Sequence, residues 1–290
     1  MSNTQLQDSQ RVSIISEALP YIRRFTGKTF VIKYGGASMV QENLKQKVIE
    51  DIALLSYVGV LPLVVHGGGP AINEMLQKLS IPKKFVDGLR VTCEQSIEVV
   101  EMVLCGKVQK EIVSLLNRAG SNAIGLSGKD ANLMKARKLV SAAEDFGFTG
   151  VVDTVSSQVL NNLIENNYLP VISSIAPDED GTTFNINADA VASKVAESIK
   201  AEKLIFLTDT PGILEKKNDP SSLIRRINSK EAKSLIEKGV IQGGMIPKVE
   251  SALEALKAGA SSVHILDGTV EHVLLLETFT EDGVGTMITL

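Results

Sequence analysis

The sequence predicts an α/β fold in which a mostly parallel sheet is covered by helices on both faces. Strand and helix patterns alternate along most of the 290 residues. Apolar strands such as 169–172 and 204–207 are continuous rather than alternating with polar residues, which is typical of parallel strands buried on both faces. Two further strands, 29–34 and 61–66, run directly into glycines and then into helical patterns.

The first predicted element is an amphipathic helix over residues 11–25, with apolar residues at three- and four-residue spacing from Val12 to Ile22. Pro20 lies inside this helix and should kink it. The remaining elements follow in order: strand 29–34, helix 41–58, strand 61–66, helix 70–79, a helical stretch at 94–119 that Gly106 is placed to interrupt, strand 122–127, β-hairpins between 135 and 155, helix 156–166, strand 169–175, helix 187–199, strand 203–208, helix 248–258 and strand 262–266. The polar stretch 176–181 is the best candidate for a joint between two lobes.

The composition excludes several classes of function. Hydrophobic residues make up 44% of the chain and charged residues 22%, and the formal net charge is −4. The negative charge argues against nucleic acid or an anionic membrane surface as a partner, and no apolar run reaches the roughly 18 residues that a membrane span needs. Cys93 and Cys105 are too few for a disulfide framework and lack metal-ligand spacing. A reducing compartment is therefore expected, either a cytoplasm or, for an organelle-encoded chain, a plastid stroma.

Two glycine turns suggest a site for anions. A strand that ends in glycine and opens a helix lets backbone N–H groups approach an anion closely, because no Cβ shields them. One such turn is Lys33-Tyr34-Gly35-Gly36 and another lies at 66–70. The chain lacks the phosphate-loop pattern G-x-x-x-x-G-K-[ST] and, after its first strand, the dinucleotide pattern G-x-G-x-x-G. We therefore expect phosphate or carboxylate chemistry at a site of another design.

Two further clusters each have a structural and a functional interpretation. In the stretch 88–92, Arg90 follows a glycine, where it could grip a carboxylate with two N–H groups or simply be a surface arginine after a turn. In the stretch 185–189, two asparagines alternate at the start of a helix. Asn187 capping that helix, with Asp189 in its first turn, would explain both residues without any function.

Two clusters lie later in the chain. Residues 207–214 end another buried strand, at the edge where parallel α/β sheets bind ligands. Residues 243–248 place two glycines before Lys248, which begins a helix. Either stretch could be a plain loop, since Gly–Pro punctuation is common. The three histidines are scattered, and none is predicted to be a base or a metal ligand.

Taken together, five of these motifs have the order and spacing of the amino acid kinase family, which the chain therefore resembles. They lie at 33–36, 66–70, 88–92, 185–189 and 243–248. The match runs from about residue 11 to residue 289, nearly the whole chain. Each motif alone is weak, but five in order are specific, and their joint occurrence outweighs the separate structural explanations.

The resemblance implies a three-layer αβα sandwich with an N-terminal oligomerisation helix (1–27), an amino-acid-binding lobe (28–178) and a nucleotide-binding lobe (179–290). It implies transfer of the γ-phosphoryl group of ATP to the side-chain carboxylate of N-acetyl-L-glutamate, the second step of arginine biosynthesis. The residues that it implicates are Gly68, Gly69, Arg90 and Asn185 for the acylated amino acid, Gly35 and Gly36 for the transferring phosphate, Lys33 and Lys248 as flanking cations held by Asp189, and Thr208, Asp209, Gly212 and Leu214 for the nucleotide.

The chemistry of such a transfer agrees with these residues. A glutamate-type carboxylate has a pKa of about 4.3, so at pH 7 it is already an ionised nucleophile and needs no general base. What is needed is in-line positioning and compensation of the charge on the phosphoryl oxygens, which lysines, backbone N–H groups and Mg²⁺ on the phosphates supply. An anion such as Asp189 between Lys33 and Lys248 would offset their mutual repulsion.

The N-terminal helix resembles that of arginine-inhibited family members, in which such helices join dimers into a hexamer, a trimer of dimers. By the same resemblance His264, Glu277 and Gly283 would lie near a site for L-arginine, with the helix as its other wall. The alternative is that the helix packs on its own core. The sequence also resembles photosynthetic-type members, some of which bind the nitrogen-signalling protein PII.

Other functions are compatible with parts of the pattern. A sister kinase acting on aspartate, free glutamate, carbamate or UMP would share the fold, although the surroundings of Arg90 and Asn185 favour N-acetylglutamate. A non-catalytic arginine or nucleotide sensor could also keep the fold. Such a sensor would have no need of both lysines and Asp189. A dehydrogenase is disfavoured by the missing glycine fingerprint.

Overall fold

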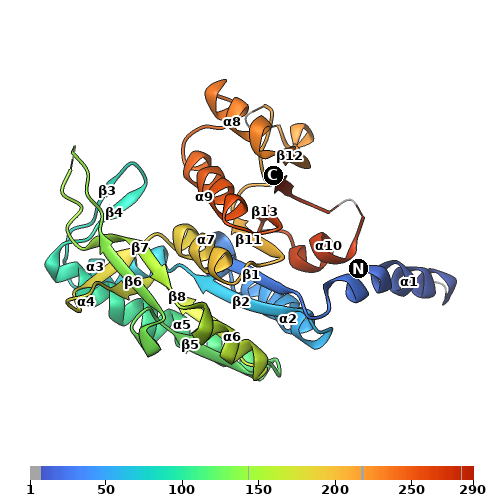
Figure 1. Cartoon of the computed structure of the whole chain (residues 1–290), viewed down its shortest axis with the longest axis horizontal. Coiled ribbons are helices and arrows are strands. Elements are labelled where there is room, and N and C mark those ends of the chain that lie inside the picture. Colours follow the sequence, from blue (N-terminus) through green and yellow to red (C-terminus); the bar gives the residue numbers. More distant parts are fainter. Residues whose placement is uncertain (1–7, 143, 217–218, 282) are drawn as a thin grey trace.

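The computed structural model of the chain describes residues 8–142, 144–216, 219–281 and 283–290 (Figure 1). Its centre is an eight-stranded sheet in the order β12-β14-β13-β11-β1-β2-β8-β5. Neighbouring strands are parallel except for β13 and β14, which are antiparallel. The strands are β1 (Thr29–Tyr34), β2 (Leu61–His66), β5 (Ala123–Leu126), β8 (Leu169–Ser173), β11 (Lys203–Thr208), β12 (Arg226–Asn228), β13 (Ser262–Asp267) and β14 (Thr286–Thr289). The predicted α/β class with a mostly parallel sheet is confirmed.

Helices cover both faces of this sheet, which gives three layers. Successive residues of β1 reach opposite faces, so that Val31 packs in one apolar core and Phe30 and Ile32 pack in the other. The Val31 core holds residues of α6 (Ser157–Glu165), α7 (Ala188–Ser198), α8 (Ser229–Glu237) and α9 (Met245–Lys257). The opposite core holds residues of α2 (Glu42–Tyr57), α3 (Gly69–Lys78), α4 (Glu94–Glu101), α5 (Gln109–Arg118) and α10 (Val273–Phe279).

Two smaller sheets stand beside the carboxyl ends of the central strands. One has four strands in the order β6-β7-β10-β9, namely β6 (Met134–Lys138), β7 (Thr149–Val155), β10 (Thr183–Ile186) and β9 (Ile175–Pro177). The other is a hairpin of β3 (Lys84–Val86) and β4 (Leu89–Val91). Its turn residues Asp87 and Gly88 both have positive φ, as a two-residue hairpin turn requires.

The division into two lobes at 178/179 stays a prediction. The stretch 176–181, expected to join the lobes, contains the turn between β9 and β10, which are antiparallel neighbours in one sheet. Two predictions of elements need correction. The predicted strand 169–175 is two strands in different sheets. Gly106 does not end the helix at 94–119, because the chain continues through it as a π-helical segment, Met102–Val108.

Other elements were not predicted at all, namely the β3–β4 hairpin, β10, β12, β14, α8 and α10. Most of these strands have only three or four residues, too few to show a periodic pattern. Between 135 and 155 the structure has one antiparallel pair, β6 with β7, in place of several hairpins.

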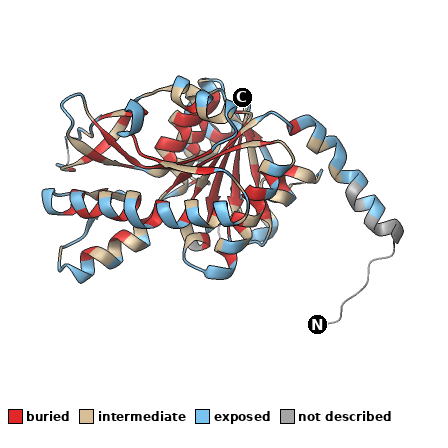
Figure 2. Cartoon of the chain, turned by 90° about the horizontal axis from the view of Figure 1, so that it is seen from below, coloured by how far each residue is buried: buried red, intermediate tan, exposed pale blue. Residues whose placement is uncertain are grey.

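The first helix, α1 (Asp8–Phe25), runs through Pro20 and projects from the body of the molecule (Figure 2). Phe25 at its end is buried, whereas Val12 and Leu19 are 64% and 49% exposed. The alternative that the helix packs its apolar face on its own core is therefore wrong for these two residues. Among the described residues, no helix is both long and apolar enough to cross a membrane.

Candidate active site

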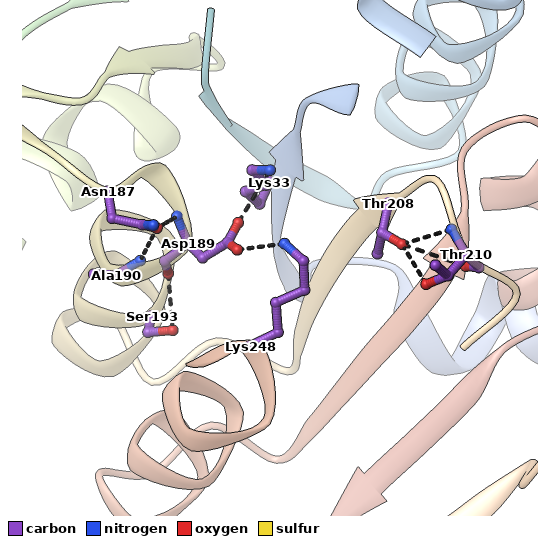
Figure 3. A network of polar contacts seen from close by, with 8 residues as sticks. All are labelled: Lys33, Asn187, Asp189, Ala190, Ser193, Thr208, Thr210 and Lys248. Atoms are coloured by element: carbon purple, nitrogen blue, oxygen red, sulfur yellow. Dashed lines mark hydrogen bonds and ion pairs between the residues drawn. The ribbon is translucent and has the colours of Figure 1, made fainter. Parts of the chain in front are cut away.

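Three charged side chains from three elements meet at the carboxyl edge of the central sheet (Figure 3). Lys33 comes from β1, Asp189 from the first turn of α7, and Lys248 from the first turn of α9. Lys33 Nζ lies 3.0 Å from Asp189 Oδ1, and Lys248 Nζ donates a hydrogen bond to Asp189 Oδ2. Burial alone would raise the pKa of Asp189, but the charges of Lys33 and Lys248 lower it below its usual value. One buried carboxylate thus holds two ammonium groups side by side.

The position of Asp189 is set by the start of its helix. Asn187 Oδ1 accepts a hydrogen bond from the Asp189 backbone N–H at 2.8 Å and caps α7. Ser193 Oγ donates to the Asp189 carbonyl at 3.0 Å, which binds the first turn to the next. The capping role expected for Asn187 is confirmed. For Asp189 that structural explanation is insufficient, because its side chain turns away from the cap toward the two lysines (Figure 3).

The glycines after β1 lie close against charged side chains. A Cβ on Gly35 would lie 2.6 Å from Lys33 Nζ, so a side chain there would displace that ammonium group from its present position over the turn. Gly36 has φ +77°, and a Cβ there would lie 2.3 Å from Asp209 Oδ1. Two hydrogen bonds fix the conformation of this turn. Tyr34 Oη donates to the Ser38 carbonyl at 2.8 Å, and Ser38 Oγ donates to the Gly35 carbonyl at 3.0 Å. The glycine backbone and the Lys33 ammonium group therefore lie side by side, an arrangement that suits a phosphate group.

A cavity of about 160 Å³ lies beside this cluster and contains the predicted substrate residues. Its lining includes Gly68, Gly69, Arg90 and Asn185, together with Phe85 from the β3–β4 hairpin. The structure therefore brings together residues from α3, β4 and β10 that are far apart in the sequence.

Arg90 is only 9% exposed, so its interpretation as a surface arginine is wrong. Its guanidinium lies 4.6 Å from the ring centroid of Phe85, and its Nη2 donates to Asn73 Oδ1 at 2.6 Å. Its Nη1 is buried and finds no hydrogen-bond partner among the described residues. A buried donor without a partner is costly, and an acidic ligand in the cavity would satisfy it.

Sequence reasoning missed Phe85 and Asn73. Phe85 pairs with Arg90 directly across the β3–β4 ladder, so the Asp87-Gly88 dipeptide between two short apolar runs was the signal that could have revealed it. Asn73 lies on the separate helix α3, and no local pattern connects it to Arg90.

The residues predicted for the nucleotide follow β11. Thr208 Oγ1 accepts a hydrogen bond from the Thr210 backbone N–H at 2.9 Å, which forms a tight turn. Asp209 in that turn lies against Gly36, so this strand end adjoins the glycine turn of β1. Gly212 approaches Thr286, where a Cβ would lie 2.5 Å from Oγ1, and Leu214 forms a bridge with Leu223. Gly212 and Leu214 thus also have a structural role, since they hold the segment after β11 against Thr286 and Leu223.

A second cavity, of about 250 Å³, lies where α1 joins the body and contains His264, Glu277 and Gly283. His264 Nδ1 donates to Glu277 Oε1 at 2.6 Å, and the Val284 N–H donates to Glu277 Oε2 at 2.8 Å. Burial alone would raise the pKa of Glu277, but the hydrogen bond from His264 lowers it. The three residues named by the sequence are therefore neighbours.

The wall of this second cavity includes residues that sequence reasoning did not find. Tyr21, Arg24 and Phe25 come from the end of α1, and Lys203 from the start of β11. Burial lowers the pKa of Lys203 to about 8, and its ammonium lies 4.7 Å from the ring centroid of Phe25. The cavity carries both charge signs, since Glu277 faces a set of basic residues, namely Arg24, Lys203, Arg225 and Arg226.

The chain is similar in sequence to known kinases. Residues 28–267 match the model of the amino acid kinase family. The chain is 54% identical over 283 residues to the acetylglutamate kinase of Thermosynechococcus vestitus and 55% identical over 281 residues to that of Trichodesmium erythraeum. These alignments cover 98% and 97% of this chain and 95% and 96% of the relatives.

A solved structure with a similar fold is the N-acetylglutamate synthase of Neisseria gonorrhoeae, crystallised with coenzyme A and N-acetylglutamate. It has a TM-score of 0.86 and 28% sequence identity, and the match covers 96% of this chain. The chain spans 63% of the length of that protein.

His66 gives a prediction about pH. It ends β2, is fully buried, and donates from Nδ1 to the Gly67 carbonyl at 2.8 Å. Burial lowers the pKa of His66 to about 4, against an ordinary value of about 6.5. The folded chain then binds fewer protons than the unfolded chain, so the stability that His66 contributes is complete above pH 6.5 and is lost as the pH falls through 4. We expect a loss of about 3 kcal/mol over this range.

The measurement is urea unfolding of the wild type and of His66→Gln at pH 7.0, 5.5 and 4.5. The variant should show a shallower fall in unfolding free energy, although buried His264, whose pKa burial also lowers, retains part of the slope. Parallel curves for the two proteins would contradict this role of His66.

Proposed function

The chain belongs to the amino acid kinase family, and we propose that it transfers the γ-phosphoryl group of ATP to the side-chain carboxylate of N-acetyl-L-glutamate. The product is an acyl phosphate, and the reaction is the second step of arginine biosynthesis. The observation that carries the proposal is the pairing of Lys33 and Lys248 with the buried carboxylate of Asp189, beside a cavity with an unsatisfied arginine donor. Relatives more than half identical over nearly their full length are named acetylglutamate kinases.

The acceptor molecule has two carboxylates, and the cavity offers a different partner for each. Arg90, held by Asn73 and Phe85, keeps Nη1 for the α-carboxylate. Asn185 and the N–H groups of Gly68 and Gly69 would bind the rest of the acylated amino acid. The side-chain carboxylate then lies toward Lys33, already ionised and ready to attack without a base.

The lysines and glycines would stabilise the charge that develops during transfer. Lys33 and Lys248 are held side by side by Asp189, and Gly35 lies directly beside the Lys33 ammonium group. These lysines, with the N–H groups of Gly35 and Gly36, would bind the phosphoryl oxygens, and donors that are already in place need no reorganisation. The nucleotide would lie against Thr208, Asp209, Gly212 and Leu214. Bound Mg²⁺ would neutralise phosphate charge. Phosphate oxygens and water would supply most of the ligands of this Mg²⁺.

The second cavity is suited to L-arginine as a feedback inhibitor. The guanidinium of arginine would pair with Glu277. Its carboxylate would pair with the basic residues around Lys203. Because α1 contributes Tyr21, Arg24 and Phe25, arginine would contact the helix and the body at once. The exposed Val12 and Leu19 on α1 support its role as an oligomerisation helix in a hexamer built as a trimer of dimers.

Two further expectations concern a protein partner and the cellular compartment. Binding of the PII protein follows from the resemblance to photosynthetic-type members, and co-elution of the two proteins would test it. A reducing compartment, a cytoplasm or a plastid stroma, agrees with Cys93 and Cys105, which are both free thiols.

The reaction itself is tested with hydroxylamine, which converts an acyl phosphate into a coloured hydroxamate. The purified protein is incubated with Mg-ATP and, separately, N-acetylglutamate, glutamate or aspartate. We expect colour only with N-acetylglutamate, because Arg90 and Asn185 lie where an acylated amino acid would bind. Colour with another acid would keep the phosphoryl transfer and change the substrate. No colour with any acid would overturn the proposal.

Lys33→Ala should lower kcat by roughly 10²–10³-fold, the scale for losing one preorganised donor. The matched control is Lys47→Ala on α2, because Lys47 also pairs with a carboxylate at 3.0 Å but lies away from the cluster. Initial rates at saturating ATP and N-acetylglutamate measure both variants. A near-normal kcat for Lys33→Ala would remove Lys33 from the catalytic machinery.

Deletion of residues 1–24 should abolish arginine inhibition while sparing catalysis, since it removes one wall of the second cavity and the exposed apolar face of α1. Inhibition curves and light scattering measure the two effects. Glu277→Gln serves as the comparison, because it should weaken inhibition while leaving assembly intact. Retained hexamers with unchanged inhibition in the deletion variant would refute this role of the helix.

A further inference from the structure

Two buried threonines connect the side chains that line the acceptor cavity. Thr92 follows β4 and is fully buried, and Thr149 begins β7 and is 4% exposed. Thr149 Oγ1 lies 2.6 Å from the Arg90 carbonyl oxygen and 3.0 Å from Thr92 Oγ1. Thr92 Oγ1 in turn lies 3.1 Å from Asn185 Nδ2. A continuous chain of hydrogen bonds thus runs from the backbone of Arg90 to the amide of Asn185.

The donors in this chain follow from its geometry. Thr149 Oγ1 is the donor toward both the Arg90 carbonyl and Thr92 Oγ1, so its single hydroxyl hydrogen is shared between these two acceptors. Thr92 Oγ1 also accepts from the Asn185 amide, which presents Nδ2 to it. The two hydroxyls therefore hold the Asn185 amide with Nδ2 turned to Thr92.

The choice of orientation decides what Asn185 offers to a ligand. With Nδ2 turned to Thr92, the amide oxygen and the second N–H remain for the cavity, and the described residues give them no other partner. The oxygen can accept from the N–H of an acylated amino group. The reversed amide would lose the hydrogen bond from Nδ2 to Thr92 Oγ1 and turn its oxygen away from the cavity.

The same threonine joins the β3–β4 hairpin to the four-stranded sheet. The Phe148 N–H donates to the Thr92 carbonyl at 2.7 Å, and the Thr92 N–H donates to the Phe146 carbonyl at 3.2 Å. Gly147 lies between them with φ +61°, and a Cβ there would be 2.4 Å from the Thr92 carbonyl oxygen. This close approach brings Arg90, on the hairpin, and Asn185, on β10, to the same cavity.

We propose that Thr92 and Thr149 are positioning residues that orient the Asn185 amide and the Arg90 segment for recognition of the acylated amino acid. The inference rests on the proposed function, because it concerns the acceptor site of that reaction. Neither threonine is needed for the phosphoryl transfer itself, since Lys33, Asp189 and Lys248 belong to other elements.

The test separates acceptor binding from chemistry. Thr92→Val and Thr149→Val each remove one hydroxyl at nearly constant shape, and Thr92→Ser and Thr149→Ser restore it. We expect each Val variant to raise the KM for N-acetylglutamate roughly tenfold, the scale of one lost hydrogen bond. The kcat and the KM for ATP should stay within about twofold, and the Ser variants should return to within about threefold of the wild type.

Two controls sharpen the result. Ser121→Ala removes a buried hydroxyl that makes no hydrogen bond to described residues. Ser121 precedes β5 and so lies at the amino end of that strand, whereas the site lies at the carboxyl edge of the sheet. The KM of this variant for N-acetylglutamate should be unchanged. In an Asn185→Ala background, Thr92→Val should have less than a twofold further effect, because Thr92 acts on the ligand through Asn185. Thermal unfolding identifies any variant that fails to fold, and the two threonines test the same chain independently.

The outcomes are distinguishable. If the wild type phosphorylates N-acetylglutamate and both Val variants keep its KM, the inference is wrong. An equal rise in the KM for ATP, or no rescue by serine, would indicate a general packing role and would also overturn it. A wild type that is inactive with N-acetylglutamate contradicts the proposed function instead.

Discussion

The structure depends on one buried carboxylate that holds two cations together. Asp189 is shielded from water, and a buried charge is tolerated only when it is paired. Its partners, Lys33 and Lys248, come from β1 and α9, so the ion pairs also join the first strand of the central sheet to a helix of the last third of the chain. The lysines would repel each other without Asp189. Removing Asp189 would leave two ammonium groups without a counter-charge, and removing either lysine would take one positive charge away from the point where the phosphoryl group would lie.

In the acceptor cavity a buried charge, that of Arg90, is held by neutral groups. The guanidinium of Arg90 is held by the ring of Phe85 and the amide of Asn73, and its backbone carbonyl accepts from the Thr149 hydroxyl. None of these groups adds a negative charge that would compete with a ligand carboxylate. Its unsatisfied Nη1 is therefore available for a ligand carboxylate. A nucleophile that is already ionised needs no base, which agrees with a site whose nearest histidine, His66, is buried and held neutral by its lowered pKa.

The second cavity lies at the amino end of β11, whereas the nucleotide residues lie at its carboxyl end. Lys203 begins β11 in the second cavity, and Thr208 ends β11 at the carboxyl edge of the sheet. In addition, α10, which carries Glu277, is bound at its start to Asp51 of α2. Asp51 Oδ1 contacts His272, and Asp51 Oδ2 accepts a hydrogen bond from the Leu274 N–H at 3.2 Å. The helix α2 follows the glycine turn of β1. Rigid elements therefore connect the proposed regulatory and catalytic regions.

The sequence by itself determined the parallel core, the glycine turns and the chemical groups of the site, because continuous apolar strands and ordered motifs are local patterns. It also indicated Lys33, Asp189, Lys248, Arg90 and Asn185 through their joint order. Short elements such as β3, β12 and α10 escaped prediction, since a few residues show no period.

Only the tertiary structure decided which groups touch. Lys248 reaches Asp189 across 59 residues of sequence, and Phe85 reaches the cavity from a separate strand. Asn73 and Thr92 contact the cavity residues Arg90 and Asn185 from behind. The second cavity likewise needs α1, β11 and α10 together. Such contacts follow from the order β13-β11-β1-β2 in the central sheet, in which strands distant in the chain become neighbours. Local sequence carries no record of that order, because each crossover helix permits more than one place for the next strand.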